Sequence, residues 1–513
     1  MNRKKTPRHF PRESGDSFSR ALIETDTAAL LKHIHDYLSP AGTRAYIVGG
    51  FVRDALLGRE TADIDLAVTG DALALARGLT GEMKGTFVLL DEINRVGRVV
   101  LKPGNEGEEP TTVDVSSMQG TIDDDLARRD FTIDAMAVDL GELVTGKTVN
   151  RLLDPFHGRD DLDRGIIRAV SDNAFSADPV RLLRAARLAT ELSFTIEPKT
   201  AGLVRKSAGL LANVPGERVR EELLRLFNAS RGGHFLLDLD ELGLLTALFP
   251  ELALTKGVTQ PAEHHWDVFT HSIMCVSAVD YLLHQGVWGY PPSDVLESVP
   301  WSPECARHFE KPVAGGSTRR TLLKLAALLH DIAKPQTKAP DETGRIRFLG
   351  HQEQGEAAVT AIMERLRFSG RETKMVAGVV KYHLRPTQMG EPPSRRAIYR
   401  YFRDTGDAGI DILYLSLADH LATRGPDLIL ENWRQHTGIV RYVLEEHFKK
   451  EAVVPPPKLV DGNVLMDVFG LVPGPRLGEL LESIREAQAA GELTTREQAL
   501  DYIRDVLSQN SKL

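Results

Sequence analysis

The sequence predicts an α+β protein, in which an N-terminal α/β unit with a short mixed sheet is followed by regions that are entirely α-helical. Within the first 150 residues, short runs rich in β-forming residues alternate with helical patterns, which is typical of an α/β unit. From Asp178 to the C-terminus, apolar residues recur mostly at helical spacing. The chain has 513 residues, enough for three or four structural units of roughly 100–200 residues each.

Composition excludes several classes of protein. Hydrophobic residues make up 42% of the chain and charged residues 26%, as in ordinary globular proteins. A formal net charge of −9 argues against a generally basic coat protein for nucleic acid, although it is compatible with a local basic groove. No apolar run approaches the ~18 residues of a membrane helix, so no membrane partner is expected. Two cysteines, Cys275 and Cys305, argue against a disulfide framework and predict a reducing, cytoplasmic location.

The elements of the α/β unit follow one another in a regular order. Alternating apolar residues and the Gly and Pro residues between them separate the strands from the helices. The segment Lys102–Pro110, rich in Gly, Glu and Pro, is predicted to be a hairpin loop. Strands are predicted at Tyr46–Val48, Ile64–Val68, Thr86–Leu90, Arg98–Leu101 and Thr111–Val115, and helices at Phe51–Leu57 and Asp71–Leu79.

Changes in composition divide the chain into five regions. Residues 1–24 are predicted to be a disordered basic tail, because the first 20 residues hold six Lys/Arg and two acids without an apolar run. The α/β unit is expected at 25–150, a helical neck and body at 151–260, a second helical domain at 261–450 and a C-terminal helical segment at 451–513. Linkers are expected at Pro291–Ser302, Lys311–Ser317 and Pro455–Pro457.

A Gly-Gly turn followed by two carboxylates is the first candidate site. The run Tyr46–Val68 reads YIVGGFVRDALLGRETADIDLAV, so a strand enters Gly49-Gly50 and a helix follows. Glycines allow close approach of a ligand, and a helix N-terminus offers free N–H groups to phosphate. Asp63 and Asp65 alternate along a strand and therefore share one face. Two carboxylates so close repel each other unless a cation lies between them, and magnesium would satisfy them; Asp114 is a candidate third acid.

This run resembles the head domain of class II tRNA nucleotidyltransferases and bacterial poly(A) polymerases, in the DNA polymerase beta-like nucleotidyltransferase superfamily. The resemblance covers roughly residues 44–255 and is carried by five motifs in the same order. It implies a polymerase beta-like head at the N-terminus. Besides GGFVRDALLG…ADIDLAV, the motifs are DLARRDFTIDAMA at Asp125–Ala137, LDPFHGRDDLDRGIIR at Leu153–Arg168, DPVRLLRAAR at Asp178–Arg187 and GERVREELLRLF at Gly216–Phe227.

The resemblance assigns roles to residues of the head. It implies that Asp63 and Asp65 bind magnesium, with Asp114 as the third catalytic acid, to activate an RNA 3′-hydroxyl and stabilise the leaving pyrophosphate. Gly50 and Arg53 would hold the triphosphate. In the sequence RRDF, Arg129 and Asp130 would contact the nucleotide, with the ribose hydroxyls as the expected target.

The segment Asp178–Arg187 is predicted to select the base. Asp178 with Pro179 looks like a helix N-cap with proline at the first helical position, and Asp178, Arg181, Arg184 and Arg187 recur every three residues. Asp178 only accepts and Arg181 only donates hydrogen bonds, which matches the edges of cytosine and adenine. In the resembling enzymes such a helix acts as a protein template. The same pattern also suits an N-cap aspartate with an i,i+3 salt bridge.

Two departures from the family pattern concern specificity. The family template usually begins Glu-Asp, whereas here Ala177 precedes Asp178. Only thirteen residues separate Asp114 from Arg128, and relatives that add the whole CCA usually carry a longer flexible loop there. The short segment Ser116–Asp123 therefore points to an enzyme that adds part of CCA.

The C-terminal half carries a second motif set of histidine and aspartate. Neutral imidazole and carboxylate are common ligands of divalent metals. The order H…HD…H…H…D resembles the HD metal-dependent phosphohydrolase superfamily, and imidazole favours a transition metal over magnesium. The predicted ligands are His271, His330, Asp331, His351, His383 and Asp419.

The leading interpretation is a template-independent RNA nucleotidyltransferase that adds C and/or A from CTP and ATP to tRNA or another RNA 3′ end, and so builds CCA completely or in part. It is linked to an HD phosphohydrolase-like domain. A poly(A) polymerase or A-adding enzyme on the same scaffold remains an alternative, since both would use the same acids. An HD phosphohydrolase whose head only binds is disfavoured by the intact Asp63 and Asp65 pair. A non-catalytic RNA-binding module is disfavoured by the two acid-rich constellations and the negative net charge.

Overall fold

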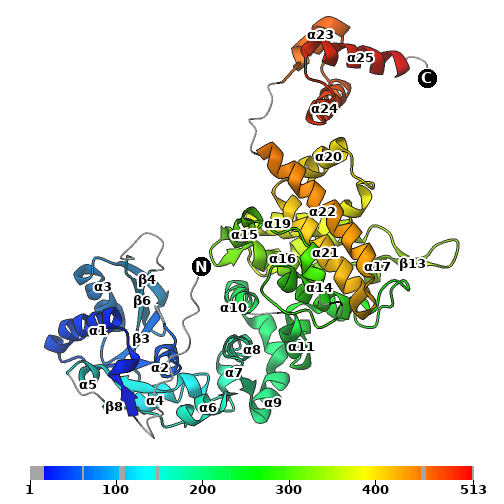
Figure 1. The fold of residues 1–513 in the computed structure, drawn as a ribbon. Coiled ribbons are helices and arrows are strands. Elements are labelled where there is room, and N and C mark those ends of the chain that lie inside the picture. The colour runs from blue at the N-terminus through cyan, green and yellow to red at the C-terminus, as the bar shows by residue number, and fades with distance from the viewer. Residues whose placement is uncertain are drawn as a thin grey trace. The chain divides into compact units, whose positions relative to one another are not determined.

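A computed structural model describes residues 17–60, 63–102, 110–145, 149–229, 232–290, 292, 294–451 and 458–510. The chain forms two compact units, Met1–Val214 and Pro215–Leu513. The first is mixed α/β and the second is mainly helical (Figure 1). The division falls inside the predicted neck, so its first part belongs with the head and its second part with the helical domain.

The first unit is built on a six-stranded mixed sheet in the order β4-β5-β6-β3-β2-β7. Strands β3 and β6 are parallel, and the other neighbouring pairs are antiparallel. The predicted strands are all present, and β7 was not predicted. The strands are β2 (Ala45–Val48), β3 (Asp63–Val68), β4 (Thr86–Asp91), β5 (Val96–Val100), β6 (Thr112–Ser117) and β7 (Ala137–Asp139).

Helices cover this sheet because they carry apolar residues at helical spacing. Helix α2 (Gly50–Leu56) follows β2 directly, and α3 (Ala72–Glu82) packs against β5 and β6. Asp71 caps α3 by accepting from the backbone N–H groups of Leu73 and Ala74. Further helices of this unit are α1 (Thr25–Leu38), α4 (Ile122–Leu126) and α5 (Leu140–Val144). The antiparallel pairing of β5 with β6 agrees with the predicted hairpin, whose loop lies mostly outside the described residues.

The predicted tail is too long at its C-terminal end. Strand β1 (Ser17–Ser19) pairs antiparallel with β8 (Val149–Arg151), and Phe18 is buried in the core. The tail prediction therefore fails for residues 17–24, since it rested on the net basic charge of the segment and did not detect the short strand Ser17–Ser19. Residues 1–16 lie outside the described residues.

The region after the sheet is mainly helical, with two differences from prediction. One is a parallel pair of short strands, β9 (Ile166–Ile167) with β10 (Thr195–Ile196), and the other lies at the base-selecting segment. Helix α7 (Ala174–Ala177) ends at Asp178, and α8 (Arg181–Leu192) begins three residues later. Asp178 has extended backbone angles, and its carbonyl accepts the N–H of Arg181 at 3.1 Å. The residue directly before α8 is Val180, so the regular helix begins two residues later than an N-cap at Asp178 predicts. Neighbouring helices are α6 (Gly158–Arg164) and α9 (Pro198–Ser207).

The second unit has a helical core formed by α14, α16, α19 and α21, with α18 packed on α19. Helix α16 is buried along nearly its whole length, as its run of leucine and alanine predicts. Figure 1 shows these helices grouped together. They are α14 (Val268–Leu282), α16 (Arg319–Leu329), α18 (His351–Arg365), α19 (Gly370–Tyr382) and α21 (Gly409–Arg424).

Four predictions about this unit need correction or stay outside the described residues. The expected linker Lys311–Ser317 contains an antiparallel pair, β11 (Pro312–Ala314) with β12 (Ser317–Thr318). A second hairpin, β13 (Lys338–Pro340) with β14 (Ile346–Phe348), also departs from the all-α prediction. Within Pro291–Ser302, residues Val295–Ser298 form a short 3-10 helix. Pro455–Pro457 lies outside the described residues.

The C-terminal helices have a small apolar core of their own. Helices α23 (Gly462–Phe469), α24 (Pro475–Ala489) and α25 (Arg496–Asn510) bury Leu465, Leu480 and Ile503 between them. Ion pairs join α24 to α20 (Arg395–Thr405), for example Arg403 to Glu482 at 2.9 Å. Among the described helices, none is both long and apolar enough to cross a membrane.

Candidate functional site

Two acids lie side by side at the centre of the head sheet. Asp65 on β3 and Asp114 on β6 are direct partners in the parallel register, so their side chains occupy one face. Asp63 lies two residues before Asp65 and is more exposed; its Oδ1 accepts the Thr112 hydroxyl at 2.6 Å. The sheet thus brings Asp63, Asp65 and Asp114 to one face, as the alternation along the strand predicts.

A cavity of 230 Å³ opens over these strands. Six of the predicted site residues line it: Gly50, Asp65, Asp114, Arg129, Asp130 and Arg184. Asp63, Arg53, Asp178, Arg181 and Arg187 are not among its lining residues. The cavity therefore collects carboxylates and arginines from β3, β6, α8 and the segment that follows α4.

Glycine is required where β2 turns into α2. Gly49 has φ +70°, and a Cβ there would lie 2.6 Å from Nη1 of Arg129 and 3.3 Å from Oδ2 of Asp65. Gly50, the predicted phosphate contact, begins α2 and lines the cavity. The Gly-Gly turn therefore lets the backbone approach both the carboxylate and the arginine, which no side chain at Gly49 would permit.

Two acids that line the cavity, Asp114 and Asp130, each have an arginine partner. Arg98 on β5 donates to both oxygens of Asp114, from Nε at 2.7 Å and from Nη2 at 2.8 Å. Arg184 lies 2.7 Å from Asp130 through its Nε. Burial would raise the pKa of Asp130, but Arg184 and Arg181 hold it below its usual value. The site thus balances much of its negative charge with guanidinium groups.

Asp65 is the carboxylate with the least favourable surroundings. Burial raises its pKa to about 6; Arg129 opposes this shift and Asp114 adds to it. A carboxylate that resists ionisation beside another carboxylate is suited to a bound cation. The oxygen-only ligands Asp63, Asp65 and Asp114 fit magnesium.

The remaining predicted nucleotide-binding residues are engaged elsewhere. The guanidinium of Arg53 is buried and bonded to Asp54 and, through Nη1, to Asp134 at 2.6 Å. Arg181 donates to the backbone carbonyl of Arg128 at 2.8 Å. Arg187 pairs with Glu191 at 2.6 Å, one helical turn further along α8. The three-residue spacing carries Arg187 around the helix and away from the cavity.

Sequence reasoning missed two residues of this site. Asp134 is buried, lines the cavity and lies 2.6 Å from Arg53 and 3.7 Å from Arg184. It stands inside the quoted motif DLARRDFTIDAMA, where an acid in an apolar run was the available signal. Arg98 was not singled out, because its importance depends on cross-strand register with Asp114.

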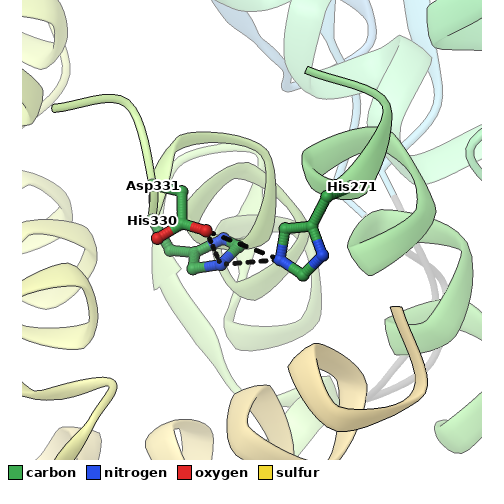
Figure 2. A group of neighbouring side chains, drawn as sticks. All are labelled: His271, His330 and Asp331. Atoms are coloured by element: carbon green, nitrogen blue, oxygen red, sulfur yellow. Dashed lines mark hydrogen bonds and ion pairs between the residues drawn. The ribbon is translucent and has the colours of Figure 1, made fainter. Parts of the chain in front are cut away.

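The second unit brings the predicted histidines and aspartates together. His271 comes from α14, His330 and Asp331 follow α16, His351 begins α18, and His383 follows α19. Figure 2 shows the Nε2 atoms of His271 and His330 and the carboxylate of Asp331 pointing toward one another. His271 Nε2 lies 3.3 Å from His330 Nε2 and 3.5 Å from Asp331 Oδ2. Asp419, on α21, lies next to this group, with its Oδ1 atom 3.1 Å from His271 Nε2.

Asp331 belongs to two groups of possible ligands. One group is His271, His330 and Asp331, and the other is Asp331, His351 and His383; in each, the ligand atoms lie within 4.8 Å of one another. The Oδ2 atom faces His330 at 3.1 Å, and Oδ1 faces His351 at 3.5 Å. Asp331 therefore lies between two positions where a cation could bind.

Backbone carbonyls orient three of the four imidazoles. The Nδ1 atoms of His330, His351 and His383 lie 2.9, 2.6 and 2.6 Å from carbonyls three residues earlier in the chain. A carbonyl can only accept, so each Nδ1 carries a proton and leaves Nε2 to face the cluster, where it presents a lone pair when the imidazole is neutral. This arrangement is typical of metal-binding histidines. Burial lowers the pKa of His383 to about 4, which keeps this imidazole neutral.

The charge of Asp331 is only partly satisfied. Both carboxylate oxygens are buried and make no hydrogen bond of good geometry with the described residues, although Lys334 lies 2.7 Å from Oδ2. Burial would raise the pKa of Asp331, but His330 and Lys334 hold it well below its usual value. Buried, ionised oxygens beside several imidazole nitrogens fit a divalent metal.

Family models match three parts of the chain. The poly A polymerase head domain matches residues 45–168, a probable RNA- and SrmB-binding site of polymerase A matches 193–255, and the HD domain matches 304–424. His271 lies ahead of the matched HD segment, although it contacts His330. Each cluster described above falls at least partly within a matched region.

Several solved structures share the fold. The Thermotoga maritima CCA-adding enzyme complexed with tRNA aligns with a TM-score of 0.60 at 21% identity, over 96% of this chain and all of that one. A CCA-adding enzyme in complex with ATP gives 0.63 at 21% identity, over 96% and 98% of the two chains.

Curated relatives are similar along nearly their whole length. The A-adding tRNA nucleotidyltransferase of Deinococcus radiodurans is 35% identical over 478 residues, 91% of this chain and 96% of the relative. The CC-adding tRNA nucleotidyltransferase of Thermus thermophilus is 33% identical over 465 residues, 90% and 93% of the two chains. On this similarity, together with the matched head, RNA-binding and HD regions, the chain belongs to the tRNA nucleotidyltransferase family.

Proposed function

We propose that this chain extends the 3′ end of tRNA with part of the CCA sequence, taking C or A from CTP or ATP. The observation that carries the proposal is the cavity in which Asp65 and Asp114 lie beside Arg129, Asp130 and Arg184. Its acids suit a two-metal phosphoryl transfer, and its arginines suit a nucleoside triphosphate. Relatives that match over nine tenths of this chain are A-adding and CC-adding enzymes.

In the proposed reaction, the residues of the chain position two substrates. Asp63, Asp65 and Asp114 would hold magnesium, which when bound lowers the pKa of the RNA 3′-hydroxyl and stabilises the pyrophosphate. Gly50, at the N-terminus of α2, would offer its N–H group to the triphosphate. Arg129 lies near Asp65 and the Gly-Gly turn, where its charge would favour phosphate, and Arg53 would stabilise this end of the site through Asp134.

Base selection is proposed to use the donor and acceptor groups of α8 and its neighbour. Asp130 and Arg184 pair at 2.7 Å at the cavity wall and offer an acceptor beside donors. Asp178 and Arg181 would act next to them, with Arg181 held by the Arg128 carbonyl. Cytosine and adenine present an amino group beside a ring nitrogen, which matches such a pair.

The short connection after β6 supports partial addition. Strand β6 ends at Ser117 and α4 begins at Ile122. Thr121 and Asp124 close the connection by a reciprocal capping box at the start of α4. The resembling enzymes that add all of CCA carry a longer loop here, and this connection is too short for one.

The test is addition to three tRNA substrates that end before CCA, after the first two C residues, or after all of CCA. Each is incubated with CTP, with ATP, and with both. Partial addition predicts one product only: CC on the first substrate, or A on the second. Complete CCA on the first substrate would contradict partial addition, and repeated A on any substrate would indicate a poly(A) polymerase.

We also propose a phosphohydrolase activity for the HD cluster, supported by the sharing of Asp331 between two ligand groups. Imidazole ligands favour a divalent transition metal here. A phosphate ester at an RNA end, such as a 2′,3′-cyclic phosphate, is the proposed substrate class. Attack of water on the phosphorus with cleavage of the bond to O3′ would leave a 2′-phosphate and a free 3′-hydroxyl for extension. Hydrolysis of a 2′,3′-cyclic phosphate after loading with manganese, nickel or zinc tests this, and no turnover with any of them would contradict it. Free Cys275 and Cys305 fit the proposed cytoplasmic location.

A further inference from the structure

Four neighbouring positions form a row across the head sheet. Arg98 on β5 pairs in register with Asp114 on β6, and Asp114 pairs with Asp65 on β3. The next strand, β2, leads into Gly49, where a Cβ would lie 3.3 Å from Asp65. Directly paired residues share a face, so the row runs from Arg98 through the two acids to the Gly-Gly turn.

The two ends of this row differ in what they can bind. At the β2 end lie backbone N–H groups of the α2 N-terminus and Arg129, where the triphosphate is proposed to bind. This inference rests on that proposed function. With the nucleotide on the β2 side of Asp65, the attacking RNA hydroxyl must approach from the opposite side, over Asp114. The group beyond Asp114 on that side is Arg98.

Arg98 has a free donor edge at this position. Its Nε and Nη2 atoms hold Asp114, while Nη1 makes no hydrogen bond or ion pair with any described residue. The side chain is one-third exposed, so its free edge is open to a ligand. A guanidinium carries five donors in one plane, and its geometry matches phosphate oxygens.

We propose that Arg98 binds the last phosphodiester of the RNA and so positions the terminal ribose with its 3′-hydroxyl beside Asp114. In the RNA, the terminal phosphodiester is separated from the 3′-hydroxyl by one ribose. In the sheet, the strand of Arg98 lies next to the strand of Asp114, at a strand spacing of about 5 Å. Asp114 fixes the guanidinium plane through its two hydrogen bonds. Arg98 is thus a positioning residue for the RNA rather than for the nucleotide.

The experiment pairs an arginine variant with a neutral phosphate. Wild type and Arg98→Gln are assayed on a tRNA with an ordinary last linkage and on one with an uncharged methylphosphonate at that linkage. A hydrogen bond to a charged group predicts that the neutral linkage raises the wild-type KM for RNA roughly 10- to 100-fold. Arg98→Gln should show the same rise on ordinary RNA and no further rise on the modified RNA. The KM for the nucleotide should stay within about threefold.

Matched controls separate this role from a structural one. Arg95 is an exposed arginine of the same hairpin and pairs with Asp71 on the surface. Arg95→Gln should leave the KM for RNA unchanged on both tRNA substrates. A methylphosphonate three linkages upstream should change the KM for RNA of both enzymes by the same factor. Equilibrium binding of RNA without nucleotide, followed by fluorescence anisotropy, should show the same dependence on Arg98 and the last linkage. Thermal melting confirms that the variants fold, and Arg98→Lys, which keeps the charge, should recover part of the loss.

Two results would overturn the inference. If the neutral linkage raises the KM for RNA of Arg98→Gln by the same factor as that of wild type, Arg98 does not contact that phosphate and only binds Asp114. If Arg98→Gln raises the KM for the nucleotide instead, the guanidinium faces the triphosphate. Failure of the wild-type enzyme to extend any tRNA would instead contradict the proposed function, so the two failures are distinguishable.

Discussion

The two acidic centres of this protein balance their negative charge in different ways. In the head, Asp114 and Asp130 each have an arginine within 2.7 Å. In the HD cluster, Asp331 faces the Nε2 atoms of histidines and one lysine. Arginine is permanently charged and can also bind phosphate, whereas histidine can bind a metal when its imidazole is neutral. In the proposed function, the head would therefore receive an anionic substrate and the HD cluster would hold a cation.

The largest expected difference comes from removing a head acid. Asp63→Ala or Asp65→Ala should reduce nucleotide addition by roughly a thousandfold, because each would remove several kcal/mol of transition-state stabilisation. Binding of tRNA and the metal content of the HD cluster should change little. Single-turnover extension and elemental analysis on the same preparations measure both. Asp123→Ala, which removes an exposed acid on α4, is the control, and near-normal addition by Asp65→Ala would refute this site.

Substitutions in the HD cluster should have the opposite pattern. Asp331→Asn should reduce binding at both metal positions, because Asp331 is common to the two groups. His271→Ala should lower metal affinity at one position and His351→Ala at the other, each by roughly 10- to 100-fold or more. Losing a residue that only supports a ligand already costs this much affinity. Nucleotide addition should stay above about a tenth of the parent rate.

Metal titration followed by elemental analysis distinguishes these cases, with exposed His234→Ala as the control. If Asp331→Asn folds and binds tRNA but loses nucleotide addition, the two centres are coupled rather than independent. Equal loss of metal in His271→Ala and His351→Ala would indicate a single position.

A smaller effect is expected on base selection. Arg184→Ala should increase misincorporation of UTP and GTP more than Arg181→Ala, because Arg184 lines the cavity and Arg181 is bonded to backbone carbonyls. A lost polar pair costs about 1–3 kcal/mol. Asp178→Ala should affect selection more than tRNA affinity. Competition between paired nucleotides gives the ratios, and unchanged ratios in all three variants would exclude α8 from base selection.

The smallest effect is one of stability. The pKa of Asp65 is about 6 in the folded protein against an ordinary value of 3.8, so its ionised form destabilises the metal-free fold. Asp65→Asn should therefore raise the free energy of unfolding by about 1–3 kcal/mol at pH 7. The gain should be complete above pH 6 and shrink toward pH 4, where the carboxyl is protonated in both states. Urea denaturation in EDTA measures it, and a loss of stability at pH 7 would contradict the assignment.

The sequence predicted the elements that local pattern controls. Alternation placed Asp63 and Asp65 on one strand face. The histidines and aspartates of the HD cluster were singled out because their order in the chain is a motif, and the structure brings their side chains together; their role as metal ligands stays a prediction. The start of α8 was missed, since proline after Asp178 resembles a capping signal, while the chain first closes a separate turn there.

Contacts between different strands and helices could not be predicted from local sequence patterns. Arg98 has no local signal, because only the register of β5 against β6 brings it to Asp114. The sharing of Asp331 between two groups depends on how α14, α18 and α19 meet around one residue. Register and helix packing are set by the whole core rather than by a window of sequence.

The pairing of β1 with β8 has a consequence for how the protein is made. Val149–Arg151 is synthesised about 130 residues after its partner Ser17–Ser19, and closing so long a loop is slow. During synthesis, β1 therefore has no partner until β8 has been translated, because the two strands form a sheet of their own. This part of the head cannot be completed before β8 has emerged from the ribosome.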